Sequence, residues 1–523
     1  MSRERPMPDA IGPDLIVEAG HVLRGLSPSG AMVAEGPSAL RIEAGRIAEI
    51  GPLETVTAGR EKLPRIGGPG LIAMPGLVNG HHHFGLTPLM AGVPFAPLEL
   101  WLPRFRAMRT LPPRLDTLYS AIEMLESGTT AVHHIHSGLP ADPDAWEPLS
   151  DAVLGAYGEI GMRAAFSWMM RDRNVLAYAP DAEVLGRMPA DLRAWVEPGL
   201  APSRTPIRDY MAFFRRLRAK HAGSDRVRIG LAPANLHWMS DAALVESFGT
   251  AAEVGAPVHM HLLETRRQAE FARAATGRGA VEHLHALGCL GPNVTLGHGN
   301  WMTAAELDLV AECGCILCHN ASSGLRLGSG IAPVNALRAR GGRVALGIDQ
   351  SNLADDRDMT LEMKLVWALH RETGMFVDRP DAAAVLGMAT EHGAASAGFG
   401  GFAGRLDPGW AADIVLMSEA RIARPRIHPR TPIAEQVLHR GAREAVDTVL
   451  VGGEVVVSGG RVTRIDRDAA MAEIDAILAA PETEAESHAW RMADRLVAHL
   501  EGEHRAHGFP DDPRRYRVNA LGG

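Results

Sequence analysis

Three consecutive histidines, His81, His82 and His83, end an apolar run that begins at Met74. If this run is a β-strand, neighbouring side chains point to opposite faces, so His81 and His83 share one face. His82 then points the other way and is expected to be structural. Two imidazoles that converge from one strand end supply half of a metal site, because histidine nitrogen is a common ligand of divalent metals.

Ligand-type side chains also end several later apolar runs, in the order of successive strands. They are His259, His261, Glu264, His298, His319, Asn320 and Asp349. Each one alone could be a hydrogen-bonded polar residue of a core. Because five runs end in this way when the histidine pair is included, we interpret the set as one shared site.

The elements that position these side chains follow from the alternation of short apolar runs with amphipathic stretches. Eight apolar runs occur between residues 74 and 350, and the stretches between them show helical patterns. Eight strands each followed by a helix are typical of a (β/α)8 barrel of the TIM type. In such barrels the catalytic residues lie at the C-terminal ends of the strands, so the chemistry is expected there.

The chain is predicted to contain four segments. Residues 71–405 form the barrel. The β patterns with glycine turns at residues 14–70 and 406–465 predict a small β-sandwich built from both chain ends. Residues 466–523 are predicted to be a helical tail, whose role the sequence leaves open.

The composition argues against several other classes of protein. The formal net charge of −9 gives no support to nucleic-acid binding, and no apolar run reaches the length of a membrane span. No apolar segment of a secretory signal follows the N-terminus, so a cytoplasmic protein is expected. The CGCILC stretch at residues 313–318 lacks the usual zinc spacing and is interpreted as a buried strand.

These motifs resemble the amidohydrolase superfamily, specifically its cytosine-deaminase-like and triazine-hydrolase-like (ATZ/TRZ) branch. The resemblance covers residues 14 to 460. It rests on the stretches PGLVNGHHH, ESGTT, HMHLLE, LGHGNWMT, HNASSGLRLGSGIAPV, GIDQ and LDPGWAADIVL.

The resemblance implies one divalent metal per chain, bound by His81, His83, His261 and Asp349. Zinc suits this set of nitrogen and oxygen ligands, and iron is the alternative. Relatives with two metals generally bridge them with a carboxylated lysine from a mid-barrel strand. None of the three lysines of this chain falls on such a strand, so a single metal is expected.

The resemblance also implies catalytic roles for three side chains. Asp349 would take a proton from the metal-bound water, whose pKa a zinc ion lowers to ~7. His298 would position the water or the tetrahedral oxygen, and Glu264 would pass a proton to a ring nitrogen of the substrate. The expected activity is removal of an amino or alkylamino group from a nitrogen heterocycle by attack of metal-bound hydroxide.

Several alternatives stay open. The same site could hydrolyse a cyclic amide, a guanidine-type C–N bond or a ring C–Cl bond, and a catalytically inactive binding protein is the alternative from another class. His259 is expected to support the ligands from one layer deeper. His134 or His136 could contact substrate or pack in the core. The expected partners are a small heterocyclic substrate and a second copy of the chain in a homodimer.

Substrate contacts are predicted for Trp101, His237, Asn320 and Gln350. Gln350 reaches the substrate only if the chain turns at Asp349, because adjacent side chains of a strand point apart. Ala234 stands where many relatives have a histidine, which puts nucleoside-type recognition in doubt.

Overall fold

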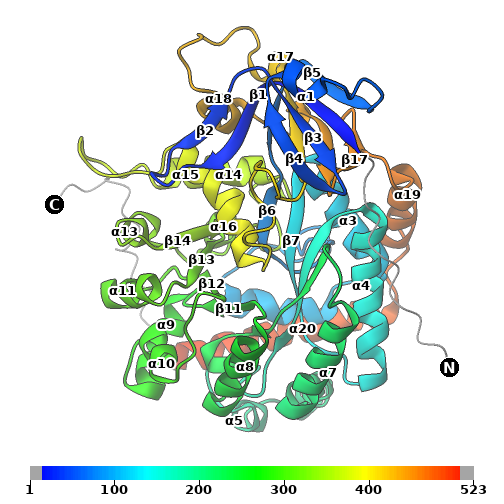
Figure 1. Cartoon of the computed structure of the whole chain (residues 1–523). Helices are drawn as coiled ribbons and strands as arrows, with labels where there is room; N and C mark the ends of the chain where they lie inside the picture. The colour runs from blue at the N-terminus through cyan, green and yellow to red at the C-terminus, as the bar shows by residue number, and fades with distance from the viewer. Residues whose placement is uncertain (1–13, 507–523) are drawn as a thin grey trace.

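The eight predicted strands are all present in the structure, a computed structural model that describes residues 14–506 (Figure 1). The fourth strand is divided into two short pieces, β9 and β10. The strands are β6 (Leu77–His82), β7 (Thr129–His136), β8 (Arg163–Met170), β9 (Val227–Ile229), β10 (Ala232–Pro233), β11 (Val258–Leu262), β12 (Val294–His298), β13 (Ile316–His319) and β14 (Arg343–Leu346).

These strands form two parallel half-barrels that meet at two backbone bridges. One half contains β6 to β10 and the other contains β11 to β14. Leu231, between β9 and β10, bridges Val258 of β11, and His82 bridges Asp349 just after β14. The Asp349 amide donates a hydrogen bond to the His81 carbonyl at 2.9 Å. The first and last strands are therefore joined at the point where two predicted ligands lie.

Helices follow the strands and cover their outer faces. Ser240 caps one of them by accepting a hydrogen bond from the Ala243 amide, and Thr303 with Glu306 forms a capping box at another. Apolar side chains of strands and helices pack into one large core. The longer helices are α3 (Pro113–Glu126), α4 (Trp146–Ile160), α7 (Ile207–Lys220), α8 (Asp241–Val254), α9 (Arg266–Thr276), α11 (Ala304–Glu312), α14 (Met359–Leu369) and α15 (Ala382–Ala389).

Short helices complete the connections between strands and between the two parts of the protein. They are α1 (Leu53–Thr57), α2 (Leu98–Trp101), α5 (Asp181–Gly186), α6 (Ala190–Val196), α10 (Ala280–Ala286), α12 (Ala321–Arg326), α13 (Val334–Arg338), α16 (Glu391–Ser396), α17 (Glu419–Ile422) and α18 (Ile433–Arg440).

Both chain ends contribute to a second sheet beside the barrel (Figure 1). Its strands are β1 (Leu15–Leu26), β2 (Met32–Glu35), β3 (Ser38–Glu43), β4 (Arg46–Gly51), β5 (Arg65–Pro75), β15 (Ile414–Ser418), β16 (Val446–Val451), β17 (Glu454–Ser458) and β18 (Arg461–Val462). They hydrogen-bond into one nine-stranded sheet, whereas the sequence predicted a sandwich. The two ends meet edge to edge, because β5 pairs with β1 on one side and with β15 on the other.

The boundary between sheet and barrel lies a few residues later than predicted. The sequence placed it at residue 70, but Leu71 to Pro75 pair with β15 and so belong to the sheet. The barrel begins with β6 at Leu77. The apolar run that ends in the histidines therefore contains the end of one strand and the start of another.

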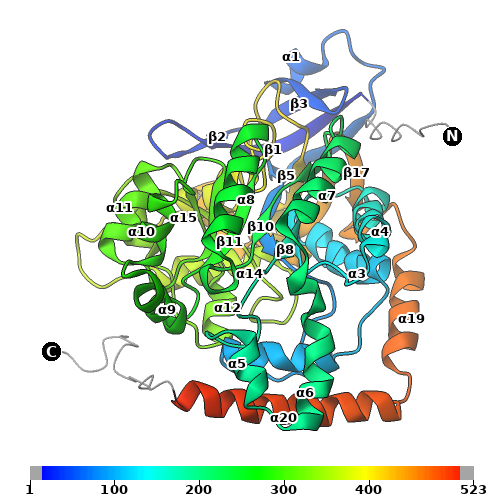
Figure 2. The ribbon, with the colours of Figure 1, turned by 90° about the horizontal axis from the view of Figure 1, so that it is seen from below.

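Two helices follow the small sheet, α19 (Arg467–Leu478) and α20 (Glu484–Ala506). Residues 507–523 of the predicted tail lie outside the described residues. Helix α20 runs across the end of the barrel opposite the small sheet, beside α5 and α6 (Figures 1 and 2). Its Leu496 and Leu500 pack against Leu176, Val184 and Leu192. In residues 14–506 no helix has both the length and the apolar character that crossing a membrane requires.

A buried ion pair joins the barrel to the small sheet. Arg163 begins β8, and Asp413 immediately precedes β15. The Arg163 guanidinium donates to both Asp413 carboxylate oxygens, at 2.6 and 2.9 Å, and both side chains are only 2% exposed. Asp413 also accepts the Gly452 amide at 2.8 Å. Removing one member of such a pair leaves an uncompensated buried charge.

We therefore expect Asp413→Ala to lower the free energy of unfolding by about 3–5 kcal/mol. Denaturant unfolding followed by tryptophan fluorescence measures this loss. Asp468→Ala is the matched control, since Asp468 pairs with Arg461 on the surface and is 75% exposed. Equal stability of the two variants would show that the buried pair adds nothing to the contact between barrel and sheet.

Candidate active site

Four predicted metal ligands bring their donor atoms together at the C-terminal end of the barrel. His83 Nε2 lies 3.1 Å from the Nε2 atoms of both His81 and His261. Asp349 Oδ1 lies 3.3 Å from His83 Nε2 and 3.7 Å from His81 Nε2. Donor atoms around a tetrahedral zinc ion are about 3.3 Å apart, given metal–ligand bonds of about 2.0–2.1 Å. The spacing of His81, His83 and His261 therefore fits a single divalent ion, with Asp349 beside two of them, and Asp349 also groups with Glu264 and His298.

The protonation states of the donors also fit a metal. His83 Nδ1 lies 2.7 Å from the Ile135 carbonyl, so it carries the proton and leaves the Nε2 lone pair free for the site. Burial, followed by the other site histidines, lowers the pKa of His81 and His261 and favours the neutral form that binds metal. Burial alone would raise the pKa of Asp349, but His83, His298 and the Ser323 hydroxyl outweigh it and keep the carboxylate charged.

His81 is held in place by a neighbouring histidine and by a small residue. His259 Nε2 lies 2.8 Å from His81 Nδ1, which matches the supporting position predicted for His259. A Cβ on Gly347 would lie 2.5 Å from His81 Cβ, so only glycine leaves room for the imidazole. His82 points away, as predicted, and its Nε2 lies 3.2 Å from the Ser120 hydroxyl of α3.

The histidines of β7 lie outside the ligand set. His134 contacts the Tyr157 hydroxyl of α4 at 2.9 Å and His136 at 3.1 Å. His133 contacts the Ser167 hydroxyl at 3.0 Å. The contacts of His134 favour core packing between the barrel and its helices over a contact with substrate.

Three non-glycine residues adopt left-handed backbone conformations where strands end at this site. Leu263, His298 and Asp349 have φ angles of 53°, 71° and 67°. Such conformations cost energy for residues with side chains and concentrate at functional sites. The turn at Leu263 brings Glu264 back over the strand end. The turn at Asp349 is the one that the prediction for Gln350 required.

Glu264 faces the ligands from this turn. Its side chain is buried, and its Oε2 lies 3.8 Å from His298 Nε2. The Glu264 amide donates to Gln268, and its carbonyl accepts from Asn300, so the backbone is fixed on both sides. Burial, with the charges of Asp349 and Glu99, raises the pKa of Glu264 well above its usual range. Burial thus favours the protonated form of the carboxyl group, which can donate a proton.

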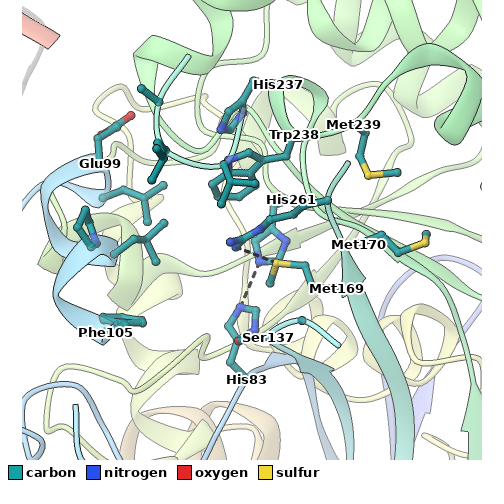
Figure 3. Close-up of a pocket in the computed structure, with 18 of the residues that line it drawn as sticks. His83, Glu99, Phe105, Ser137, Met169, Met170, His237, Trp238, Met239 and His261 are labelled. Atoms are coloured by element: carbon teal, nitrogen blue, oxygen red, sulfur yellow. Dashed lines mark hydrogen bonds between the residues drawn. The ribbon is translucent and has the colours of Figure 1, made fainter. Parts of the chain in front are cut away.

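A cavity of about 420 Å³ opens above these residues. His83, His261, Glu264, His298 and Asp349 line its inner end, and Figure 3 shows His83, His261 and Met169 grouped there with Trp238 nearby. Apolar side chains form much of the remaining wall, including those of Phe84, Leu98, Leu102, Phe105, Met169, Leu176 and Ile207. An apolar cavity with convergent polar groups at one end is the usual form of a small-molecule site.

The four predicted substrate contacts fall in different places. His237 and Gln350 line the cavity. Asn320 lies beside His298, with its amide nitrogen 3.4 Å from both ring nitrogens. Trp101 departs from the prediction: it is 1% exposed and packs on Phe95 and Phe105 outside the cavity wall. Helix α2 directs the Trp101 indole into the apolar cluster formed by the loop after β6, so the side chain has a packing role.

Sequence reasoning missed several residues that line the cavity. Arg106 and Arg171 come from loops after β6 and β8, and Tyr178 lies further along the second loop. Leu496 and Leu500 come from α20. Their spacing of four residues indicates an apolar helix face, but nothing in the pattern says what that face covers.

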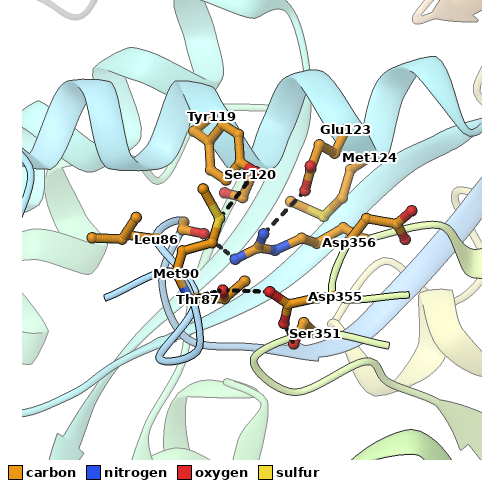
Figure 4. A network of polar contacts seen from close by, with 12 residues as sticks. Leu86, Thr87, Met90, Tyr119, Ser120, Glu123, Met124, Ser351, Asp355 and Asp356 are labelled. Atoms are coloured by element: carbon orange, nitrogen blue, oxygen red, sulfur yellow. Dashed lines mark hydrogen bonds and ion pairs between the residues drawn. The ribbon is translucent and has the colours of Figure 1, made fainter. Parts of the chain in front are cut away.

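A buried polar network ties together the loops that follow β6 and β14 (Figure 4). Arg357 donates to Glu123 of α3 at 3.0 Å and to two carbonyls of the loop after β6. The Thr87 hydroxyl donates to Asp355 at 2.8 Å. Because Gln350 begins the loop that contains Asp355, this network fixes one wall of the cavity relative to the other.

Comparison with known proteins agrees with this geometry. Residues 72–456, which include all four donor residues, match the Amidohydrolase family. The chain belongs to the amidohydrolase family. A curated member of similar sequence is 5-methylthioadenosine/S-adenosylhomocysteine deaminase of Nitratidesulfovibrio vulgaris, strain Miyazaki F. The two are 30% identical over 441 residues, which cover 83% of this chain and 91% of the relative.

Two solved structures of similar fold are an adenosine deaminase and a triazine hydrolase. The adenosine deaminase from Xanthomonas campestris, described with bound zinc, has a TM-score of 0.71 and 24% identity and covers 94% of this chain and all of its own. The triazine hydrolase from Arthrobacter aurescens has a TM-score of 0.76 and 21% identity and covers 90% of this chain and all of its own. At these identities the likeness concerns the fold. The family match ends at residue 456, so α20 lies beyond it.

Proposed function

We propose that this amidohydrolase is a metal-dependent aminohydrolase that removes an amino or alkylamino group from a nitrogen heterocycle. The observation that supports this most directly is the convergence of donor nitrogens from His81, His83 and His261, with Asp349 beside two of them, at the inner end of a cavity that Glu264 also faces. The deaminase names of relatives add support. Zinc is the proposed metal, because it suits these ligands. The dimer and the cytoplasmic location stay predictions.

Asp349, His298 and Glu264 are proposed to have different roles in the reaction. When bound, the divalent metal supplies a water whose pKa is lowered to about 7. Asp349, whose Oδ2 accepts the Ser323 hydroxyl at 2.6 Å, would accept the proton of that water. His298 positions the oxygen that attacks the ring carbon. Glu264 would donate its proton to a ring nitrogen, and the proton held by Asp349 would pass to the amino group, which leaves as ammonia or an amine as the C–N bond breaks. The hydroxyl proton of the added oxygen would return to Glu264 as the ring carbonyl forms.

Ammonia or amine release from a panel of aminated purines, pyrimidines, pterins and triazines tests this proposal. The metal-loaded protein should release amine from at least one ring class. The panel should also contain a cyclic amide and a chlorinated triazine, because the same side chains could serve those reactions. Turnover of these two compounds alone would replace the proposed reaction with another hydrolysis at the same site.

The side-chain amide of Gln350 is proposed to form a hydrogen bond with a carbonyl or ring N–H of the substrate. Its backbone turns at Asp349, and the residue lines the cavity. We expect Gln350→Gly to raise KM by about 10-fold or more on the best substrate and to broaden the substrate range, because a buried hydrogen bond discriminates against analogues that lack it. Metal content should not change. Kinetics identical to those of the parent on every substrate would assign Gln350 to packing.

A further inference from the structure

Two arginines line the cavity beyond the metal ligands, and neither has a carboxylate partner. Arg106 lies before α3 and Arg171 lies just after β8. Among the side chains that the structure describes, no Asp or Glu oxygen lies within 4.0 Å of either guanidinium. Buried or partly buried arginines in proteins are normally paired, so a bound anion would supply the partner that these two lack.

Arg171 is partly buried, and not all of its donors have hydrogen-bond partners. Its guanidinium carbon lies 4.0 Å from the centre of the Trp238 ring, and its Nη2 lies 3.2 Å from the Met169 sulfur, which is a weak acceptor. Its Nε is buried with no hydrogen-bond partner among the described residues. A buried charged donor without a partner costs free energy that a bound acceptor would recover.

Arg106 lies close enough for the two positive charges to interact. Its guanidinium packs against Gly199, where a Cβ would lie 2.0 Å from Nη1. Burial, and then the charge of Arg106, lowers the pKa of Arg171 to about 10. Burial also lowers the pKa of Arg106, although Asp181 partly opposes it. Both side chains stay charged at neutral pH and repel each other.

The other carboxylates that line the cavity have their own hydrogen-bond donors. Glu99 accepts the hydroxyls of Tyr178 at 2.9 Å and Thr265 at 2.6 Å. Asp172 accepts the hydroxyl and the amide of Ser240. Neither carboxylate forms an ion pair with Arg106 or Arg171, although Asp181 lies near enough to raise the pKa of Arg106.

We infer that Arg106 and Arg171 form an anion subsite that binds a carboxylate on the substituent of the substrate. The inference rests on the proposed function, which places the heterocycle at the metal ligands. The guanidinium group offers a planar fork of donors that matches a carboxylate. The apolar side chains between the two ends of the cavity, such as Met169 and Leu98, would contact the carbons that join ring and carboxylate.

Calorimetric titration with two matched compounds tests the subsite. N-(3-carboxypropyl)melamine and N-butylmelamine share an aminated triazine and a four-carbon chain, and only the first carries a carboxylate. The metal-loaded protein carries Glu264→Gln in every case, so that the compounds are not consumed. We expect the carboxylate compound to bind about 10–100-fold more tightly, as charge-assisted hydrogen bonds in a partly buried site provide.

Arg171→Met should abolish this preference while N-butylmelamine binds as before, and Arg171→Lys should keep part of it. Arg208→Met is the matched control, because Arg208 follows the cavity residue Ile207 but its side chain is 83% exposed. It should leave the preference unchanged. If Arg171→Met also lost N-butylmelamine, its cavity would have collapsed, and Arg106→Met would decide the question by the same criterion.

Equal affinity of the two compounds for the parent, or a preference that survives both methionine variants, would overturn the inference. Failure of the proposed function would be seen in a different measurement, the release of amine. Binding is measured without turnover, so a carboxylate preference that depends on Arg171 supports the subsite even if the enzyme with Glu264 intact releases no amine from either compound. Absence of binding by both compounds would count against the subsite as well as against triazine substrates.

Discussion

Glu264→Gln should lower kcat by about 10²–10⁴ while the protein keeps its metal and its fold. This is the usual contribution of general acid–base catalysis, and glutamine has no proton of comparable acidity to give. Glu264 is expected to show the effect because it is buried, faces His298 at 3.8 Å and has a pKa raised by burial. Its backbone contacts to Gln268 and Asn300 do not involve the carboxyl group, so they should survive the change.

Glu246→Gln is the control for this substitution, because Glu246 is an exposed residue of α8. It should have the kcat of the parent. Steady-state kinetics and metal analysis of both variants would decide the role of Glu264. Near-normal turnover by Glu264→Gln would show that another group moves the proton to the ring.

His261→Ala should remove the metal. The parent is expected to hold about one divalent ion per chain, because His81, His83 and His261 group around one position with Asp349 beside two of them. Loss of even an outer partner of a metal ligand costs 10–100-fold in affinity or activity, so loss of a ligand should lower activity by at least about 100-fold. Elemental analysis after dialysis measures the metal.

The lysines support a single ion. Lys220 pairs with Asp151 on the surface and Lys364 donates to the Gly441 carbonyl, so neither reaches the ligands. His439→Ala is the control for His261→Ala, since His439 is an exposed partner of Glu435. It should keep its metal. Two tightly bound ions in the parent, bridged by a side chain, would contradict the arrangement of ligands described above.

The sequence predicted the strand order because that order follows from simple periodicities, whereas the resemblance to a known family selected the four proposed ligands from the polar residues at the strand ends. Alternation of side chains along β6 places His81 and His83 together and turns His82 toward Ser120. The matching ends of parallel strands then bring His261 and Asp349 to the same place.

Other features depend on contacts that a linear pattern does not record. The predicted barrel domain began at residue 71, but pairing of residues 71–75 with β15 places them in the small sheet. Trp101 has the residue type of a ring-stacking contact, but α2 buries it among other aromatic rings. The position of α20 over the cavity depends on where a distant helix docks. The arginine pair depends on a short 3-10 helix after β6, Leu102–Ala107, and on the irregular segment after β8.

The central claim is that this site exchanges an amino group on a ring carbon for oxygen from water. The most direct measurement is mass analysis of product formed in heavy-oxygen water from a compound that releases amine in the panel. We predict one heavy oxygen on the ring carbon and one amine released for each product, with neither formed by His261→Ala. Amine release without heavy oxygen in the ring, or equal product from His261→Ala, would contradict hydrolysis at this site.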